Sequence, residues 1–239
     1  MRIGIIIQAR MGSQRLPGKV LQRVAGKPLL EYLLERLERG TGGLQRVVAT
    51  STEAPDDPLE QFCAARGIPC HLGPMLDVAG RFWTAARVFG FDGFVRLSAD
   101  SPLLDQGLVD WAVRLFCGGA FDLVTNVAIR SFPHGQSVEV VRTSAFARAC
   151  GTMDEAADRE HVTRFFYRNP AAFAIHNFTA CQDYSDLQFS VDTPADAQRC
   201  AALLSCMERP HWQYGWRELI ELSRHLEKTA VAGMATWTR

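Results

Sequence analysis

Short apolar runs rich in β-branched residues alternate along this chain with longer amphipathic segments. Because parallel strands must be joined by crossovers, this alternation predicts a layered α/β domain with a largely parallel sheet. Strands are predicted at residues 3–7, 46–50, 69–72, 93–97, 122–125, 138–141 and 187–191. Helices are predicted to begin at Pro28, Pro58, Val78, Gln106, Arg159 and Pro194. Several of these starts combine proline with an Asp or Thr that can cap the helix.

The alternation becomes irregular in the second half of the chain. Residues 126–183 mix strand-like and helix-like pieces with Pro133, Gly135 and Pro170, which predicts an irregular lobe over the sheet. Such a lobe suits a binding pocket or a contact between subunits. The composition changes again after Cys206. We therefore expect one principal domain over residues 1–206 and a helical tail over residues 207–239.

The balance of 26 Lys and Arg against 26 Asp and Glu argues against a nucleic-acid-binding protein, because such proteins need a basic surface. The seven cysteines show no paired CxxC spacing, and the N-terminal apolar run is too short for a signal peptide. No apolar run approaches the length of a membrane-spanning helix. We expect a cytoplasmic protein with reduced thiols that binds neither nucleic acid nor membranes.

The first predicted strand leads directly into the segment QARMGSQRLPGK, which spans Gln8 to Lys19. A strand, a glycine-containing loop and a helix together point backbone N–H groups at an anion. Gly12 and Gly18 fit that geometry, and Arg10, Arg15 and Lys19 supply charge for phosphate oxygens. The alternative is a solvated basic loop. The segment matches neither the Walker A pattern nor the GxGxxG fingerprint, so it predicts phosphate binding by a different loop.

Two aspartates follow predicted strands. Asp100 lies in RLSADSPLLD, and Asp192 lies in FSVDTPAD just before a predicted helix. Ligands of open α/β sheets bind outside the carboxyl ends of strands, and Mg²⁺ suits carboxylates combined with substrate phosphates. Each aspartate is also well placed to cap a helix, and the spacing alone leaves both interpretations open.

Five motifs in the same order resemble a known family. They are QARMGSQRLPGK, RLSADSPLLD, FPHGQSVEVV, DREHVT and FSVDTPAD, and they extend over residues 3–197. Together they resemble the cytidylyltransferases of the spore-coat polysaccharide SpsF type, which are relatives of the CMP-sialate and CMP-Kdo synthetases. The resemblance implies a Rossmann-like nucleotidyltransferase fold, three-layer α/β/α, with a mixed, mainly parallel sheet of about seven strands. It also implies a homodimer that uses CTP and Mg²⁺, with residues 1–206 as the catalytic domain.

The resemblance assigns roles to individual residues. Arg10, Lys19, Asp100 and Asp192 would be catalytic, and the two aspartates would hold Mg²⁺. The nucleotide site would comprise Gln8, Ala9, Arg10, Gly12, Ser13, Arg15, Lys19, Asp77, Arg81 and Ser98. Residues 126–183 would form the acceptor or dimer lobe, and the acceptor contacts would be His134, Ser137, Glu139, Arg159 and His161. The alternatives are a plain turn residue for His134 and an ordinary helix start for Arg159 and His161.

One departure from the family pattern bears on the acceptor. The family usually places an aspartate two residues before Glu139, where this chain has Ser137. If that acid contacts the acceptor in relatives, we expect this chain to take a different acceptor or to bind the usual one differently. The resemblance itself implies transfer of CMP from CTP to an anionic sugar-like acceptor, favouring a nonulosonic-type sugar acid, with release of pyrophosphate. Two alternatives remain open: a nucleotidyltransferase that uses another nucleoside triphosphate and a sugar or alcohol phosphate or a phosphonate, and a non-catalytic nucleotide-binding subunit.

Overall fold

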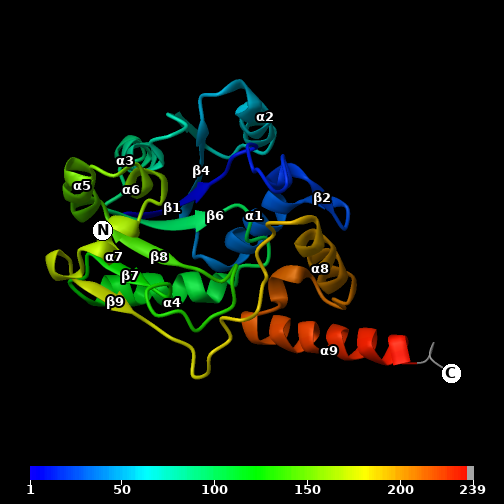
Figure 1. The fold of residues 1–239 in the computed structure, drawn as a ribbon. Helices are drawn as coiled ribbons and strands as arrows, with labels where there is room; N and C mark the ends of the chain where they lie inside the picture. The colour runs from blue at the N-terminus through cyan, green and yellow to red at the C-terminus, as the bar shows by residue number, and fades with distance from the viewer. Residues whose placement is uncertain (236–239) are drawn as a thin grey trace.

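The computed structural model describes residues 1–235, of which 229–235 are described as backbone only. Its centre is a seven-stranded sheet of order β5-β4-β1-β6-β8-β7-β9 (Figure 1). The strands are β1 (Ile3–Gln8), β4 (Gln45–Ser51), β5 (Cys70–Gly73), β6 (Gly93–Ser98), β7 (Leu123–Thr125), β8 (Glu139–Arg142) and β9 (Ile175–Asn177). Only β8 runs antiparallel to its neighbours in this sheet. The predicted mixed, mainly parallel sheet is confirmed.

Helices cover both faces of the sheet. One hydrophobic core lies under α1 (Leu29–Gly40), α2 (Asp57–Ala65), α4 (Gln106–Gly118), α8 (Pro194–Ser205) and α9 (Trp216–Ala235). The other lies under α3 (Val78–Val88), α5 (Thr143–Thr152) and α7 (Arg164–Arg168), and α6 (Ala156–Glu160) packs on α3. The alternation of side chains along β1 separates the two cores, because Ile5 and Ile7 enter the first core and Ile6 enters the second. The three-layer arrangement is thus the predicted one.

Most helix starts follow local capping chemistry. Asp77 and Asp105 accept hydrogen bonds from the backbone at the start of α3 and α4, and Thr193 forms a capping box at the start of α8. The predicted starts of α1, α2, α3, α4 and α8 agree with the structure to within one residue. The start predicted at Arg159 is wrong, because α6 begins at Ala156. Helices α5 and α7 were not expected, nor was the short hairpin of β2 (Arg23–Val24) and β3 (Lys27–Pro28).

The strand predicted at residues 187–191 is wrong. The seventh strand of the sheet is β9, and residues 187–191 form an extended segment between two loops. Phe189 N donates to His134 O at 2.8 Å, and Val191 N donates to Asp100 O at 2.8 Å. Gly135, at φ +90°, permits this approach, because a Cβ there would lie 2.4 Å from the backbone nitrogen of Ser190. The segment therefore brings the residue that follows it, Asp192, beside Asp100.

The described part of the C-terminal tail is helical and packs against the rest of the chain. Tyr214, Trp216 and Leu219 belong to the same hydrophobic core as β1, and Figure 1 shows α9 leading away from that core towards the C-terminus. The boundary at Cys206 stays a prediction, and residues 236–239 of the predicted tail lie outside the described residues. In the part of the chain that is described, no helix has the length and apolar character needed to cross a membrane.

Candidate active site

The loop after β1 is held by backbone and side-chain hydrogen bonds. Met11 O accepts from the backbone nitrogens of Ser13 and Gly18, both at 2.9 Å. Gly18, at φ +70°, turns the chain into a short 3₁₀ helix that begins at Lys19. The buried Asp56 anchors the loop from outside, since its carboxylate accepts from Met11 N at 2.7 Å. Residues 8–19, the end of β1 and the loop after it, are the segment predicted to bind phosphate, and we refer to them as the phosphate loop.

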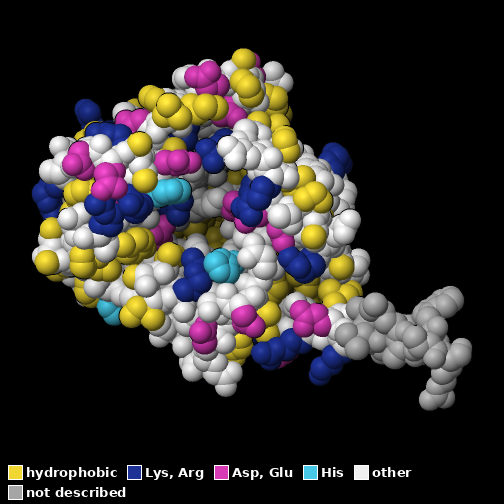
Figure 2. All heavy atoms as spheres, in the orientation of Figure 1, with side chains coloured by type: hydrophobic (Ala, Val, Ile, Leu, Met, Phe, Trp, Pro, Cys, Tyr) yellow, Lys and Arg dark blue, Asp and Glu magenta, His cyan; other side chains and the backbone are white. Residues whose placement is uncertain are grey.

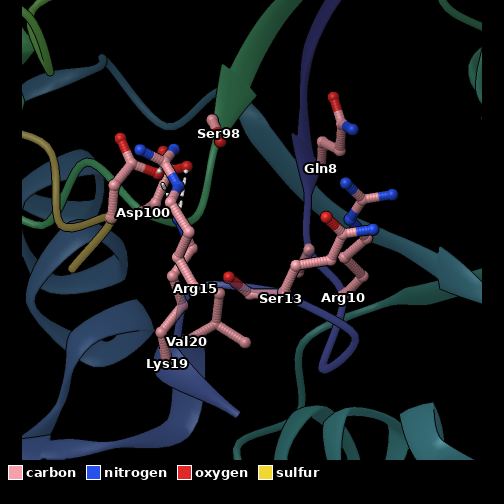
Figure 3. A pocket seen from close by; sticks show the side chains of 11 residues that line it. Gln8, Arg10, Ser13, Arg15, Lys19, Val20, Ser98 and Asp100 are labelled. Atoms are coloured by element: carbon pink, nitrogen blue, oxygen red, sulfur yellow. Dashed lines mark hydrogen bonds and ion pairs between the residues drawn. The ribbon is translucent and has the colours of Figure 1, made fainter. Parts of the chain in front are cut away.

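Lys19 lies between Asp100 and Asp192. Its Nζ donates to Asp100 Oδ2 at 3.0 Å and to Asp192 Oδ1 at 2.8 Å, and its side chain is only 10% exposed. Arg15 adds a second cation 3.2 Å from Asp192. Figure 3 shows Arg15 and Lys19 rising from the phosphate loop towards Asp100. Residues separated by more than 170 positions thus form one charged cluster.

This cluster lies in a cavity of about 370 Å³. Small-molecule sites commonly occupy roughly 300–1,000 Å³. The cavity is lined by Gln8, Ala9, Arg10, Ser13, Gln14, Arg15, Lys19, Val20, Ser98, Asp100 and Asp192. Figure 2 shows the hollow on this face, with basic, acidic and histidine side chains around it. Three cations against two carboxylates leave the lining with an excess of positive charge, which suits a polyanion.

Most of the predicted nucleotide residues line this cavity, and three do not. Gly12 is exposed, its φ is not in the left-handed region, and a Cβ there would meet no other atom. Neither the backbone conformation nor the surroundings require a glycine at this position. Asp77 caps α3, and Arg81 is fully buried, with Nη1 donating to Pro74 O at 3.3 Å. Gln14 and Val20 line the cavity but were not predicted, although both lie in or beside the quoted motif.

The predicted acceptor residues separate into two groups. Arg159 faces a different cavity, of about 420 Å³, where its guanidinium lies 3.4 Å from the Asp77 carboxylate and 3.0 Å from Met153 O. Arg159 therefore has local partners, and the structure does not place it against the phosphate loop. Its neighbour Glu160 does reach that loop, 3.7 Å from Arg10. His161 is exposed just after α6.

Glu139 does not offer a free carboxylate, which differs from its predicted role as an acceptor contact. It is 1% exposed, and its Oε2 accepts from Arg96 at 2.8 Å. The hydroxyl of Tyr167 donates to its other oxygen. Burial raises the pKa of Tyr167, and the charge of Glu139 raises it further, so Tyr167 stays a proton donor. Arg96 also donates to Gln8 at 3.1 Å, so this network orients a residue of the cavity wall.

Ser137 and His134 lie on the loop that precedes β8. Arg130, which the sequence motifs did not single out, donates to Ser137 Oγ at 3.1 Å. His134 is exposed, and its backbone pairs with the segment that carries Asp192. Burial lowers the pKa of the His134 imidazole, the charge of Arg130 lowers it further, and Asp192 opposes them. The backbone of His134 donates to Leu187 O and accepts from Phe189 N, both at 2.8 Å, so its loop lies against the segment that ends at Asp192.

The aspartate pair fits a magnesium ion. Both carboxylates converge on one cation position, which the ammonium of Lys19 contacts. Mg²⁺ prefers oxygen ligands and is commonly bound by one or two carboxylates together with waters and substrate phosphates. The described residues contain no group of three or more His, Cys, Asp or Glu side chains that could hold a metal by themselves. The donor set therefore suits a metal that arrives with a polyphosphate.

Comparisons with known proteins agree with this geometry. Residues 4–226 match the family model described as cytidylyltransferase. The chain is 31% identical to the spore coat polysaccharide biosynthesis protein SpsF of Bacillus subtilis over 86% of this chain and 88% of that protein. It is 27% identical to the 3-deoxy-manno-octulosonate cytidylyltransferase of an Anaeromyxobacter species over 87% of this chain and 99% of that protein.

A solved structure is similar over nearly the whole chain. The cytidylyltransferase from Leptospira borgpetersenii superposes with a TM-score of 0.91 at 29% identity, covering 95% of this chain and 96% of that one. The family-model match over residues 4–226 spans the phosphate loop and both aspartates. Sequence, fold and family model give the same result: the chain belongs to the cytidylyltransferase family of nucleotidyltransferase enzymes.

Proposed function

We propose that this enzyme transfers CMP from CTP to a small anionic sugar-like acceptor and releases pyrophosphate, with Mg²⁺ as the metal. The observation that carries the proposal is the contact of Lys19 with both Asp100 and Asp192 inside a cation-rich cavity at the carboxyl ends of β1 and β6. This arrangement supplies cations for a triphosphate and carboxylates for a metal in one place. The name of the Anaeromyxobacter relative, which acts on a sugar acid, supports an anionic acceptor.

The side chains of the cavity match the charge changes of such a transfer. The acceptor hydroxyl gives up its proton to water, and its oxygen bonds to the α-phosphorus as the bond from that phosphorus to the bridging oxygen breaks. The electron pair of the broken bond leaves with pyrophosphate. Arg10, Arg15 and Lys19 line the cavity and would neutralise the charge that accumulates on this leaving group. Positioning of the two substrates would provide much of the remaining acceleration.

Asp100 and Asp192 would hold the metal. Bound there, Mg²⁺ would supply neutralisation and orientation of the phosphate oxygens. Lys19 already bonds both carboxylates, so it would keep them aligned before substrate binds and would turn to the phosphates when the metal takes their charge. This role requires a mobile ammonium, which a lysine provides better than the rigid fork of arginine.

The choice of nucleotide is tested by thermal shift with CTP, UTP, ATP and GTP, each with Mg²⁺. A ligand present at 100 times its dissociation constant stabilises the folded state by about 2.7 kcal/mol. We expect CTP to raise the melting temperature more than the other three nucleotides. A larger shift with UTP, ATP or GTP would contradict CTP as the donor.

The reaction itself is tested by pyrophosphate release from CTP with three acceptor classes: nonulosonic acids, other sugar acids and phosphonates. We expect release with one of these classes in the presence of Mg²⁺ and its loss when EDTA is added. Release that is insensitive to EDTA would remove the metal role of Asp100 and Asp192. Binding of CTP without release in any class would remove the proposed acceptor chemistry.

A further inference from the structure

Arg130 is a partly buried arginine on the loop between β7 and β8 with an unusually weak partner. Its Nη1 donates to the hydroxyl of Ser137 at 3.1 Å. In the described part of the chain no Asp or Glu forms an ion pair with Arg130. None of its guanidinium nitrogens is a buried atom that lacks a hydrogen-bond partner. A guanidinium carries five N–H donors in a planar fork. Arg130 therefore keeps donors that face solvent-accessible space.

The carboxylate of Glu139 acts on the charge of Arg130 without pairing with it. Glu139 lies close enough to act on its charge, yet both Glu139 oxygens are taken by Arg96 and Tyr167. Two guanidinium groups therefore share one carboxylate, and the local cluster retains a net positive charge. Because Arg130 keeps free donors and a charge that no carboxylate pairs with, an anion that binds there gains charge-assisted hydrogen bonds.

The position of Arg130 relates it to the active-site cavity. Arg96 pairs with Glu139 across β6 and β8, and Gln8 pairs with Ser98 across β1 and β6. Ser137 lies two residues before Glu139, which Arg96 links to Gln8 of the cavity wall. The hydroxyl that Arg130 contacts is therefore close in the chain to a network that reaches the cavity. His134 lies between Arg130 and Ser137 in the chain, and its backbone bonds Leu187 and Phe189 in the segment that leads to Asp192.

We propose that Arg130, together with the Ser137 hydroxyl, binds the anionic group of the acceptor, a carboxylate or a phosphonate. Ser137 is then a specificity-determining residue, because a neutral hydroxyl leaves the charge of Arg130 free for the substrate. An aspartate at this position would pair with Arg130 and compete with the acceptor. The inference rests on the proposed function, since it names the acceptor subsite of that reaction, and it replaces Arg159 as the principal cationic contact.

The test measures anion binding at Arg130 directly. The side-chain Nε–H resonance of Arg130 is assigned by its loss in Arg130→Lys, and the full-length protein with Mg²⁺ and CTP is titrated with acetate, inorganic phosphate and neutral acetamide. CTP occupies the phosphate loop, so phosphate cannot act there. We expect a saturable shift with acetate or phosphate and none with acetamide. The stronger of the two anions identifies the acceptor group as carboxylate-like or phosphonate-like.

Ser137→Asp is the decisive variant, and Ser144→Asp is its control. Ser144 is exposed on α5, so its replacement adds the same charge away from the cleft. We expect anion binding to weaken about tenfold in Ser137→Asp and to be unchanged in Ser144→Asp. Absence of a saturable shift, or equal affinity in parent and Ser137→Asp, would overturn the proposal.

CTP-induced thermal shift separates this inference from the proposed function. We expect Ser137→Asp to retain the CTP shift of the parent, because Ser137 does not line the cavity of the phosphate loop. Failure of the parent to bind CTP would contradict the proposed function, while the response of Arg130 to anions would still be read. A loss of the CTP shift in Ser137→Asp alone would assign Ser137 to the nucleotide site and contradict its role at the acceptor.

Discussion

Lys19 is the residue on which the charged groups of the site converge. Replacing it by methionine keeps most of the side-chain volume but removes the cation between Asp100 and Asp192. Loss of one group that stabilises developing charge commonly costs at least about 100-fold in turnover. We expect Lys19→Met to lower pyrophosphate release at saturating CTP and saturating acceptor by about this factor. Lys27→Met is the matched control, because Lys27 pairs with Glu35 outside the cavity.

The expected loss concerns turnover rather than folding. Circular dichroism and the melting temperature should show a folded Lys19→Met protein, whose two aspartates then repel each other in the absence of metal. Added Mg²⁺ should therefore stabilise the variant more than the parent. Turnover equal to that of Lys27→Met would show that Lys19 does not act on the leaving group.

At this scale the sequence predicts residues that lie in short motifs and misses those that act through distant partners. Local patterns placed Lys19 in a cationic loop and both aspartates after predicted strands, and the structure brings the three residues together. Arg130 follows no motif, and its role depends on Ser137 and on an ion pair formed between other strands. The fold decides which charged side chains pair with one another. It therefore also decides which arginine is left without a carboxylate partner.

Asp56 shows how one element supports another, since it connects α2 to the phosphate loop. One carboxylate oxygen accepts from Met11 N, and the other accepts from the Ser51 hydroxyl at 2.5 Å and from Ser51 N at 3.2 Å. In Asp56→Asn one carboxylate oxygen, which accepts hydrogen bonds, becomes an amide NH₂ group, which donates them. We expect a loss of about 2 kcal/mol in unfolding free energy and a rise of about fivefold in the dissociation constant of CTP. Urea unfolding and calorimetry measure the two effects.

The exposed neighbour Asp57 provides the control, as Asp57→Asn. Burial opposes ionisation of Asp56, but its hydrogen bonds with Ser51 and Met11 outweigh burial and lower its pKa below the ordinary 3.8. A depressed carboxyl pKa contributes stability that is present above the ordinary value and is lost as pH falls through the folded value. The stability of the parent and of Asp56→Asn should therefore converge in that acidic range. A difference in unfolding free energy that stays constant down to pH 2 would show that the ionised carboxylate of Asp56 does not cause it.

Helices and strands were predictable where the local sequence pattern matches the place of the segment in the sheet or against it. The buried strands of the first half and the capped helices follow directly from apolar runs and Asp or Thr caps. Residues 187–191 have the apolar alternation of a strand, yet their backbone groups bond His134 and Asp100 in loops. The true edge strand β9 is three residues long and only partly buried, so it carries little periodic signal. Tertiary partners, which a single segment does not encode, decide such cases.

At the scale of the whole molecule, Arg36 joins three parts of the chain. It lies fully buried on α1 and donates to Leu104 O and Tyr214 O, both at 2.6 Å, and to His211 O. Burial lowers the pKa of Arg36 to about 10, and the charge of Asp105 opposes this. Arg36 therefore remains charged at neutral pH. It fixes the segment that enters α9 against the loop that enters α4.

This arrangement predicts a global effect without a local one at the active site. In Arg36→Met the three carbonyls lose their donor in a buried place, and we expect the free energy of unfolding to fall by about 3 kcal/mol. Because Arg36 does not line the phosphate-loop cavity, the dissociation constant of CTP for the folded variant should match that of the parent. Urea unfolding and calorimetry measure both quantities, with Arg114→Met, an exposed arginine of α4, as the control. Unfolding of Arg36→Met at the same urea concentration as the control would contradict this role of Arg36. Apolar contacts of Tyr214 and Trp216 would then suffice to hold residues 211–214 and α9 in place.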